Sequence, residues 1–134
     1  MAKKTLQDML DDHARWLKGV AEGIRGRLDN MQFGGMDLAG RDLRDISLRE
    51  ADLSGCNLAG ANLRGANLSG ANLRGANLAG ANLEDTDMSN ADLRQAVLVG
   101  ANLDGADAWR SNLYGAVIAP DVLHRLLGCV APGR

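Results

Sequence analysis

Aromatic residues, threonines and cysteines are scarce in this chain of 134 residues. Aromatic residues make up 3% of the sequence, which is low for a globular core but suits a narrow interior filled by leucine and alanine. Thr5 and Thr86 are the only threonines, so a threonine ladder for binding ice is excluded. The two cysteines, Cys56 and Cys129, lie far apart and indicate no disulfide framework, and Cys56 is expected to be a buried free thiol.

The sequence also lacks the side-chain groupings that catalysis and metal binding require. His13 and His124 are the two histidines, they lie at opposite ends of the chain, and no serine or cysteine is spaced to act beside either. There is no His/Cys cluster with zinc spacing, no phosphate-binding loop and no GxGxxG motif. We therefore expect no catalytic residue, no metal site and no cofactor, and we expect His13 to pack in the core or at its rim.

Long apolar runs and a strong charge of one sign are missing as well. No run approaches the roughly 20 apolar residues that a membrane-spanning helix needs. The basic start MAKK is followed by LQDMLDD where a secretory signal would have an apolar segment, so the cytoplasm is the expected location. A net charge of −2 leaves no basic footprint for direct nucleic-acid binding.

What the sequence does contain is a five-residue repeat, clearest in ADLSG CNLAG ANLRG ANLSG ANLRG ANLAG AN from Ala51 to Asn82. With leucine as the central position, the register runs in steps of five from Phe33 to Ile118, which gives 18 units. Alanine stands two residues before the centre in eleven units, Asn or Asp usually precedes the centre, and glycine usually stands two after it. The centre is leucine in fourteen units, and the other four centres are Phe33, Met88, Ala108 and Ile118.

A period of five residues fits neither a straight helix nor a flat strand. On a helix, successive leucines would lie about 140° apart, and on a flat strand they would alternate between the two faces. Both conflicts disappear if the chain turns a corner once per repeat, because glycine accepts positive φ and Asn or Asp bonds the nearby backbone. The repeat predicts an all-β solenoid whose core includes Leu53, Leu58, Leu63, Leu68, Leu73, Leu78, Leu83, Leu93, Leu98 and Leu103.

Tandem A(D/N)LxG units, from about Met31 to Ala119, resemble the pentapeptide-repeat family. The resemblance implies a right-handed, four-sided β-helix with four repeats per coil. Eighteen units then make about 4.5 coils, a rod roughly 20 Å long at the usual spacing of stacked strands. A period of five also argues against the acyltransferases built from six-residue repeats. The resemblance is specific for the fold and names no molecular target.

Helical caps are expected at the ends, because an open β-solenoid end exposes unpaired backbone groups. Thr5 and Asp8 resemble a capping box, and apolar residues at helical spacing predict a helix from about Leu6 to Lys18. Gly19 and Gly23 leave open whether a second short helix follows. We therefore divide the chain into an N-terminal helical cap (1–30), the repeat β-helix (31–119) and a C-terminal cap or dimerisation segment (120–134) with a short helix near its start.

Arg41 is an anomaly among the inward positions of the first units, which are Met31, Met36, Arg41 and Ile46. These side chains are larger than the alanine that follows in later units, so we expect the first coil to meet the helical cap. An inward charge is costly without a partner. We expect Arg41 to reach solvent or to pair with Asp8, Asp11 or Asp12.

When a coil holds four units, residues twenty apart stack on the same side of the rod. On one side the stacked residues become apolar towards the C-terminus. Two interpretations stay open: the end of the chain covers this side, or the side is a face for self-association or for a partner. Several relatives with this repeat dimerise through their C-terminal ends, so the resemblance adds the expectation of a homodimer. The candidate interface consists of Val97, Val99, Val117, Val122, Leu123, Leu126 and Leu127.

These patterns predict a non-enzymatic interaction or structural module, a rigid rod that displays side-chain columns to a protein partner that the sequence does not identify. The resemblance supplies an alternative, a DNA-mimic inhibitor or protector of a bacterial type II topoisomerase. A third reading is a phage or mobile-element protein that blocks another nucleic-acid enzyme. A mimic needs a continuous acidic face, and the repeat region, with a net charge of −4, is interrupted by Arg44, Arg49, Arg64, Arg74 and Arg94.

Overall fold

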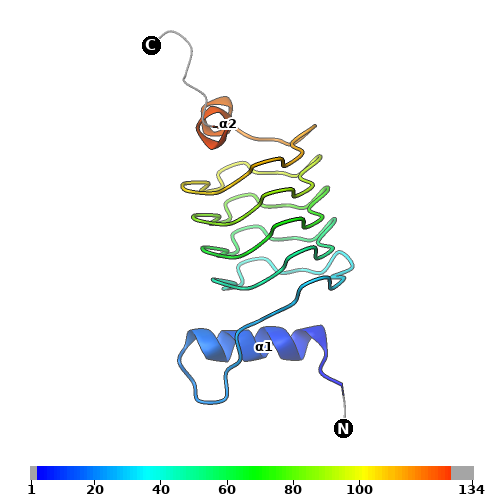
Figure 1. Ribbon diagram of the computed structural model, residues 1–134, viewed down its shortest axis with the longest axis vertical. Coiled ribbons are helices and arrows are strands. Elements are labelled where there is room, and N and C mark those ends of the chain that lie inside the picture. Colours follow the sequence, from blue (N-terminus) through cyan, green and yellow to red (C-terminus); the bar gives the residue numbers. More distant parts are fainter. Residues whose placement is uncertain (1–2, 128–134) are drawn as a thin grey trace.

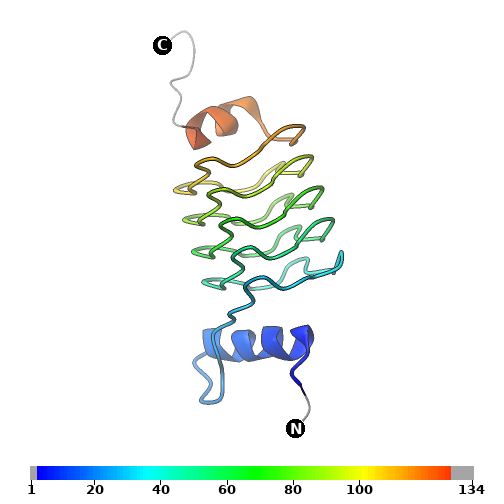
Figure 2. The same cartoon turned by 45° about the vertical axis from the view of Figure 1, so that its right-hand side comes forward.

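The computed structural model describes residues 3–127, which form a stack of coils between two helices (Figure 1). Helix α1 (Leu6–Leu17) lies across the N-terminal end of the stack, and helix α2 (Pro120–Leu126) lies at the opposite end, as both views show (Figures 1 and 2). Between the helices the chain pairs through isolated parallel bridges, because it bends too often to form long strands. The coils therefore make a rod with a helix at each end.

Every bridge joins residues twenty apart, from Arg27 with Ser47 to Val97 with Val117. A turn occurs every five residues, so each coil of twenty residues has four sides. The first bridge lies at Arg27, four residues before the predicted boundary at residue 31, and Leu28 occupies a buried repeat centre. This unit, GRLDN, escaped the sequence pattern because glycine replaces the alanine two residues before the centre and asparagine replaces the glycine two residues after it.

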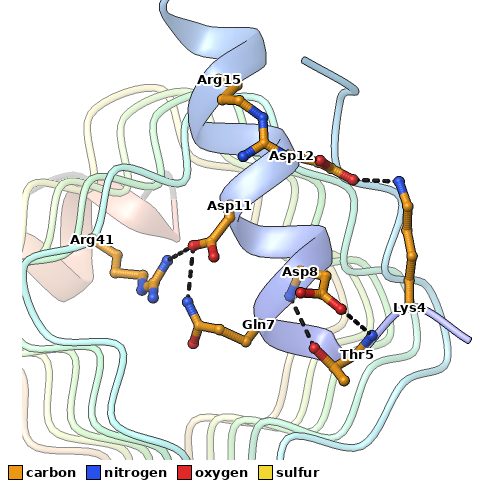
Figure 3. Close-up of polar contacts among 8 residues, drawn as sticks. All are labelled: Lys4, Thr5, Gln7, Asp8, Asp11, Asp12, Arg15 and Arg41. Carbon is orange, nitrogen blue, oxygen red and sulfur yellow. Dashed lines mark hydrogen bonds and ion pairs between the residues drawn. The ribbon is translucent and has the colours of Figure 1, made fainter. Parts of the chain in front are cut away.

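Helix α1 begins with the predicted capping box. The Thr5 hydroxyl accepts from the Asp8 N–H at 3.1 Å, and the Asp8 carboxylate accepts from the Thr5 N–H at 3.0 Å (Figure 3). The helix ends at Leu17, one residue before the predicted end. A second short helix is not formed: residues 18–22 include two turns, residues 23–26 have no regular structure, and the Ile24 N–H donates back to the Asp12 carbonyl at 3.2 Å. That bond directs the chain along α1 towards the first coil.

Arg41 and the acids of α1 are arranged as an ion-pair group beside the first coil (Figure 3). Arg41 Nη1 lies 3.8 Å from Asp11 Oδ1, and the Arg41 side chain remains partly exposed. Asp12 instead binds Lys4 Nζ at 2.5 Å and Arg15. Of the partners expected for Arg41, the structure therefore selects Asp11, and the inward charge reaches both an acid and solvent.

The interior of the rod is filled by the repeat centres. The ten leucines expected in the core are between 0 and 7% exposed, and most of the alanines two residues before them are buried too. Cys56 replaces one of these alanines, is fully buried, and its pKa is raised by burial, which disfavours the reactive thiolate. Cys129 lies outside the described residues. Close packing of leucine and alanine therefore joins each coil to the next.

Most corners are held by an Asn or Asp that stands directly before the centre. Its side chain points outward and accepts from the N–H two residues on, as Asn57 does from Ala59 at 3.1 Å and Asn72 from Arg74 at 3.1 Å. The second turn residue has positive φ, which is 68° at Gly75 and 61° at Gln95. Glycine adopts this conformation freely, whereas an L side chain is strained there.

The same column of turns offers a matched pair of substitutions. Gly75→Ala should lower the free energy of unfolding by about 1 kcal/mol, because an added Cβ meets no atom within 4 Å and only the positive φ opposes it. Gln95→Gly should raise the free energy of unfolding by about 0.5 kcal/mol. The relief of backbone strain in the folded state outweighs the entropy that glycine adds to the unfolded chain. Urea unfolding measures both, and shifts of the same sign would contradict this account of the corners.

Candidate interaction surface at the C-terminal coil

The last coil ends in an open edge. In earlier coils the centre N–H donates to the coil above, as Leu83 does to the Asn102 carbonyl at 2.7 Å. Within residues 3–127, the corresponding donors of the last coil reach no backbone carbonyl; they belong to Gly100, Leu103, Gly105, Ala108, Arg110, Leu113 and Gly115. Unpaired strand edges of this kind are ready templates for pairing with another chain.

Helix α2 covers only part of this edge. Val122 and Leu126 are partly buried and pack against the core. The helix starts at Pro120, and the Leu123 N–H donates to the Ala119 carbonyl at 2.9 Å. An open pocket of about 400 Å³ lies between α2 and residues 101–106, and a second of about 440 Å³ lies between the end of α2 and residues 106–111. The helix thus caps the tube through two side chains and leaves its flanks open.

Large apolar side chains are exposed around the last coil, on three of its four sides. The exposed fraction is 55% for Val99, 63% for Trp109, 79% for Tyr114 and 52% for Val117, and Leu127 beyond α2 is 52% exposed. We call these five residues the collar. Between residues 25 and 98, no large apolar side chain is exposed. The outer surface of the rod is therefore polar along its length and apolar at its C-terminal coil.

The interface predicted from the sequence is divided by the structure. Val99 and Val117 are exposed on one side of the rod with the half-buried Val97 between them, and the chain as far as residue 127 does not cover them. Leu127 is exposed and Leu123 half-buried, whereas Val122 and Leu126 face the tube. Sequence reasoning missed Trp109 and Tyr114. The sequence did contain a clue to them, because two of its only four aromatic residues stand at outward positions of the same coil.

Trp109 is also held in place by a neighbour. The guanidinium carbon of Arg110 lies 4.9 Å from the centre of the Trp109 ring, within the range of a cation–π contact. A large aromatic surface that is already oriented loses little conformational freedom on binding, which favours a role as an anchor. Trp109 is therefore the candidate anchor of the collar, and Tyr114, its most exposed member, is the second candidate.

The two histidines lie apart in the structure. His13 is buried between α1 and the first coil, and His124 is half-buried on α2. Among residues 3–127, His, Cys, Asp and Glu side chains form no group of three or more that could hold a metal ion. Over the same residues, neither helix has the length and apolar character needed to cross a membrane.

Comparison with known proteins identifies the repeat scaffold that carries this surface. The sequence matches the family described as Pentapeptide repeats in 8 copies, over residues 32–70, 56–95 and 81–118. The chain is similar to the pentapeptide repeat protein Rfr23 from the cyanobacterium Cyanothece 51142, with 36% identity and a TM-score of 0.66. That match covers 69% of this chain and 64% of Rfr23, so the chain spans somewhat less than two thirds of that relative.

Two further solved structures are similar over most of this chain. A pentapeptide repeat protein from Nostoc PCC 7120 is 30% identical, with 86% of this chain and 96% of that protein covered and a TM-score of 0.45. A pentapeptide repeat protein from the Arabidopsis thaliana thylakoid lumen is 32% identical, with 76% and 74% covered and a TM-score of 0.40. A comparison with curated proteins finds no match.

Proposed function

Because this chain belongs to the pentapeptide-repeat family, we propose that it is a non-enzymatic interaction module that associates with a second copy of itself through its C-terminal coil. The body of the module is the right-handed, four-sided rod that the resemblance implies. One observation carries the proposal: every exposed large apolar side chain of the coils lies in the last one. The open edge and the partly uncovered end of the tube lie beside those side chains.

The area of contact favours the end of the rod over its valine side. That side is roughly 10 Å wide and 20 Å tall, about 200 Å², whereas a stable interface buries about 800 Å² on each partner. Val97, Val99 and Val117 alone are therefore insufficient. A contact that also takes in the tube end, α2, Trp109 and Tyr114 adds the apolar surface that the valine side lacks. It would bury the open edge as well.

The charges of the rod do not favour the alternative of a DNA mimic. Arg44 pairs with Asp42 at 2.7 Å and Arg94 with Asp92 at 2.7 Å, so acids and bases alternate within single repeats. Between coils, Arg64 Nε lies 3.5 Å from Glu84 Oε2. These pairs interrupt the continuous acidic face that a mimic requires. The mixed surface instead suits a soluble rod whose specific contacts lie elsewhere.

The collar is tested by removing its aromatic side chains. Trp109→Ser together with Tyr114→Ser should weaken self-association by about tenfold to a hundredfold, the loss expected for interface anchors. The matched control is Arg49→Ser with Arg74→Ser, which changes outward residues of the same two columns in earlier coils. Size-exclusion chromatography with light scattering over a concentration series gives the dissociation constants. Equal dissociation constants for the two double variants would contradict the assignment of the collar.

A further inference from the structure

His13 is the only side chain through which α1, the linking segment 18–26 and the first coil are hydrogen-bonded together within the described chain. The ring is fully buried. The Gly26 N–H donates to His13 Nδ1 at 2.8 Å, and His13 Nε2 lies 2.8 Å from the Arg44 carbonyl oxygen. Because Nδ1 accepts a hydrogen bond, the proton of the neutral ring must reside on Nε2, which donates to Arg44.

The Arg44 carbonyl belongs to the open N-terminal edge of the β-helix. One coil further on, the equivalent carbonyl of Arg64 accepts from the Asp45 N–H at 3.0 Å, and no coil precedes the first to supply such a donor for Arg44. His13 takes the place of that missing backbone donor. Arg25 adds a second side-chain bond beside it, donating from Nε to the Asp45 carbonyl at 2.7 Å, although the equivalent carbonyl of Gly65 accepts no backbone N–H within the described residues. The cap is thus joined to the edge by two side-chain hydrogen bonds, and that of His13 replaces a bond between strands.

We propose that His13 is an acid-released clasp that holds α1 and the linking segment over the N-terminal edge of the β-helix. A second proton on the ring must bind at Nδ1, where it would point at the Gly26 N–H. Two donors then face each other, the Gly26 bond is lost, and a buried imidazolium is left with the Arg44 carbonyl as its only acceptor. The neutral ring fits this site and the protonated ring does not.

The charged groups around His13 come from all three elements. Asp42 and Asp45 of the first coil favour the protonated ring, whereas Arg25 of the linking segment disfavours it. Asp42 also forms an ion pair with Arg44. On α1, the adjacent Asp12 is paired with Lys4 and Arg15. The attraction of Asp42 and Asp45 for a protonated ring is therefore opposed by the Arg25 cation and by the removal of the ring from water.

Burial is the main influence on His13 and lowers its pKa, with Arg25 acting in the same direction and the Arg44 carbonyl, Asp42 and Asp45 against it. The docked cap therefore holds fewer protons than the released cap, whose histidine titrates near the ordinary value of about 6.5. Docking is at full strength above that pH and weakens as the pH falls through the lowered pKa. Mild acid thus favours release.

Release would uncover a surface that neutral conditions keep closed. Leu10 of α1 and Ile46 of the first coil are buried in the docked state, and the Gly26 backbone lies against the Ile46 side chain. Removing the cap exposes these side chains together with the carbonyl and N–H groups of the first coil. An uncovered strand edge pairs readily with another chain. The clasp therefore makes the N-terminal edge an acid-dependent contact site, separate from the collar.

The test follows backbone amide protection by NMR hydrogen exchange from about pH 7.5 to about pH 5. In the wild-type protein the amides of Gly26 and Ile24 should lose protection as the pH falls, while that of Leu73 in the middle of the rod keeps it. The nitrogen chemical shifts of the His13 ring should show an Nε2-protonated neutral tautomer at the upper pH. Protonation of the ring should coincide with the loss of Gly26 protection.

Two variants separate the clasp from a general effect of acid. His13→Gln, which cannot gain a proton, should show no loss of Gly26 protection between the two pH values, and His124→Gln should behave as the wild type. If His13→Gln leaves the cap undocked at every pH, the wild type and His124→Gln still test the proposal. In both of them, the loss of Gly26 protection must coincide with protonation of the His13 ring. A His13 ring that becomes protonated while the Gly26 amide stays protected would overturn the proposal, and so would an unchanged pH response in His13→Gln.

Discussion

Leu73→Asp should abolish the folded rod. Leu73 is fully buried near the middle of the stack, and its N–H donates to the Asp92 carbonyl of the next coil at 2.8 Å. The substitution removes a buried leucine, which alone costs about 2–5 kcal/mol, and places a carboxylate in an interior lined by leucine and alanine. The combined loss is about 5 kcal/mol or more, comparable with the whole stability of a small domain. Circular dichroism and thermal unfolding measure it.

Arg74→Asp is the matched control, because it changes the next residue in the same repeat. Arg74 is exposed and makes no ion pair within the described chain. Its replacement should alter the free energy of unfolding by no more than about 0.5 kcal/mol. Equal tolerance of the two aspartates would show that the assignment of inward and outward positions in the repeat is wrong.

Gly23→Ala should detach the N-terminal cap. A Cβ at Gly23 would lie 2.5 Å from the Trp16 Cα and 2.5 Å from the Arg15 carbonyl carbon, and closer still to the Trp16 backbone nitrogen. Backbone atoms cannot turn aside as a flexible side chain can, so the linking segment must move away from α1. We expect a loss of about 2–3 kcal/mol, together with lost protection of the Gly26 amide.

Gly19→Ala distinguishes this steric effect from the ordinary cost of replacing glycine. Gly19 has a φ of 70°, and an added Cβ there meets no atom within 4 Å. Its replacement should cost about 1 kcal/mol through backbone strain and leave the amide of Gly26 protected. A larger effect at Gly19 than at Gly23 would mean that the linking segment does not lie against α1 as described.

The repeat made the coil predictable because one physical requirement recurs at every unit. A leucine every five residues stays buried only if the backbone turns at the same interval, and the twenty-residue register follows once the four-sided family is recognised. The unit around Leu28 was missed because Gly26 stands where most units have alanine and Asn30 stands where most units have glycine. The turn still forms, since Asn30 adopts the positive φ of a turn glycine, at 62°.

The candidate surface was less predictable, because it depends on which coil is last and on what covers it. Val99 and Val117 follow from the stacking of one column, but the inward direction of Val122 and Leu126 follows only from the placement of α2 on the tube. Trp109 gains its significance from the polar surface of all earlier coils. The partners of His13 could not be predicted either, because its contacts come from segments whose relative positions the repeat does not determine.

Small-angle X-ray scattering over a concentration series tests the central claim, that copies of this rod join through their C-terminal coils. At high concentration the particle should double in mass and become about twice as long as the monomer, since contact at one end places two rods in line. A particle that stays monomeric at every concentration would contradict the proposal. A dimer that keeps the length of a single rod would do so too, because its contact would lie along the sides.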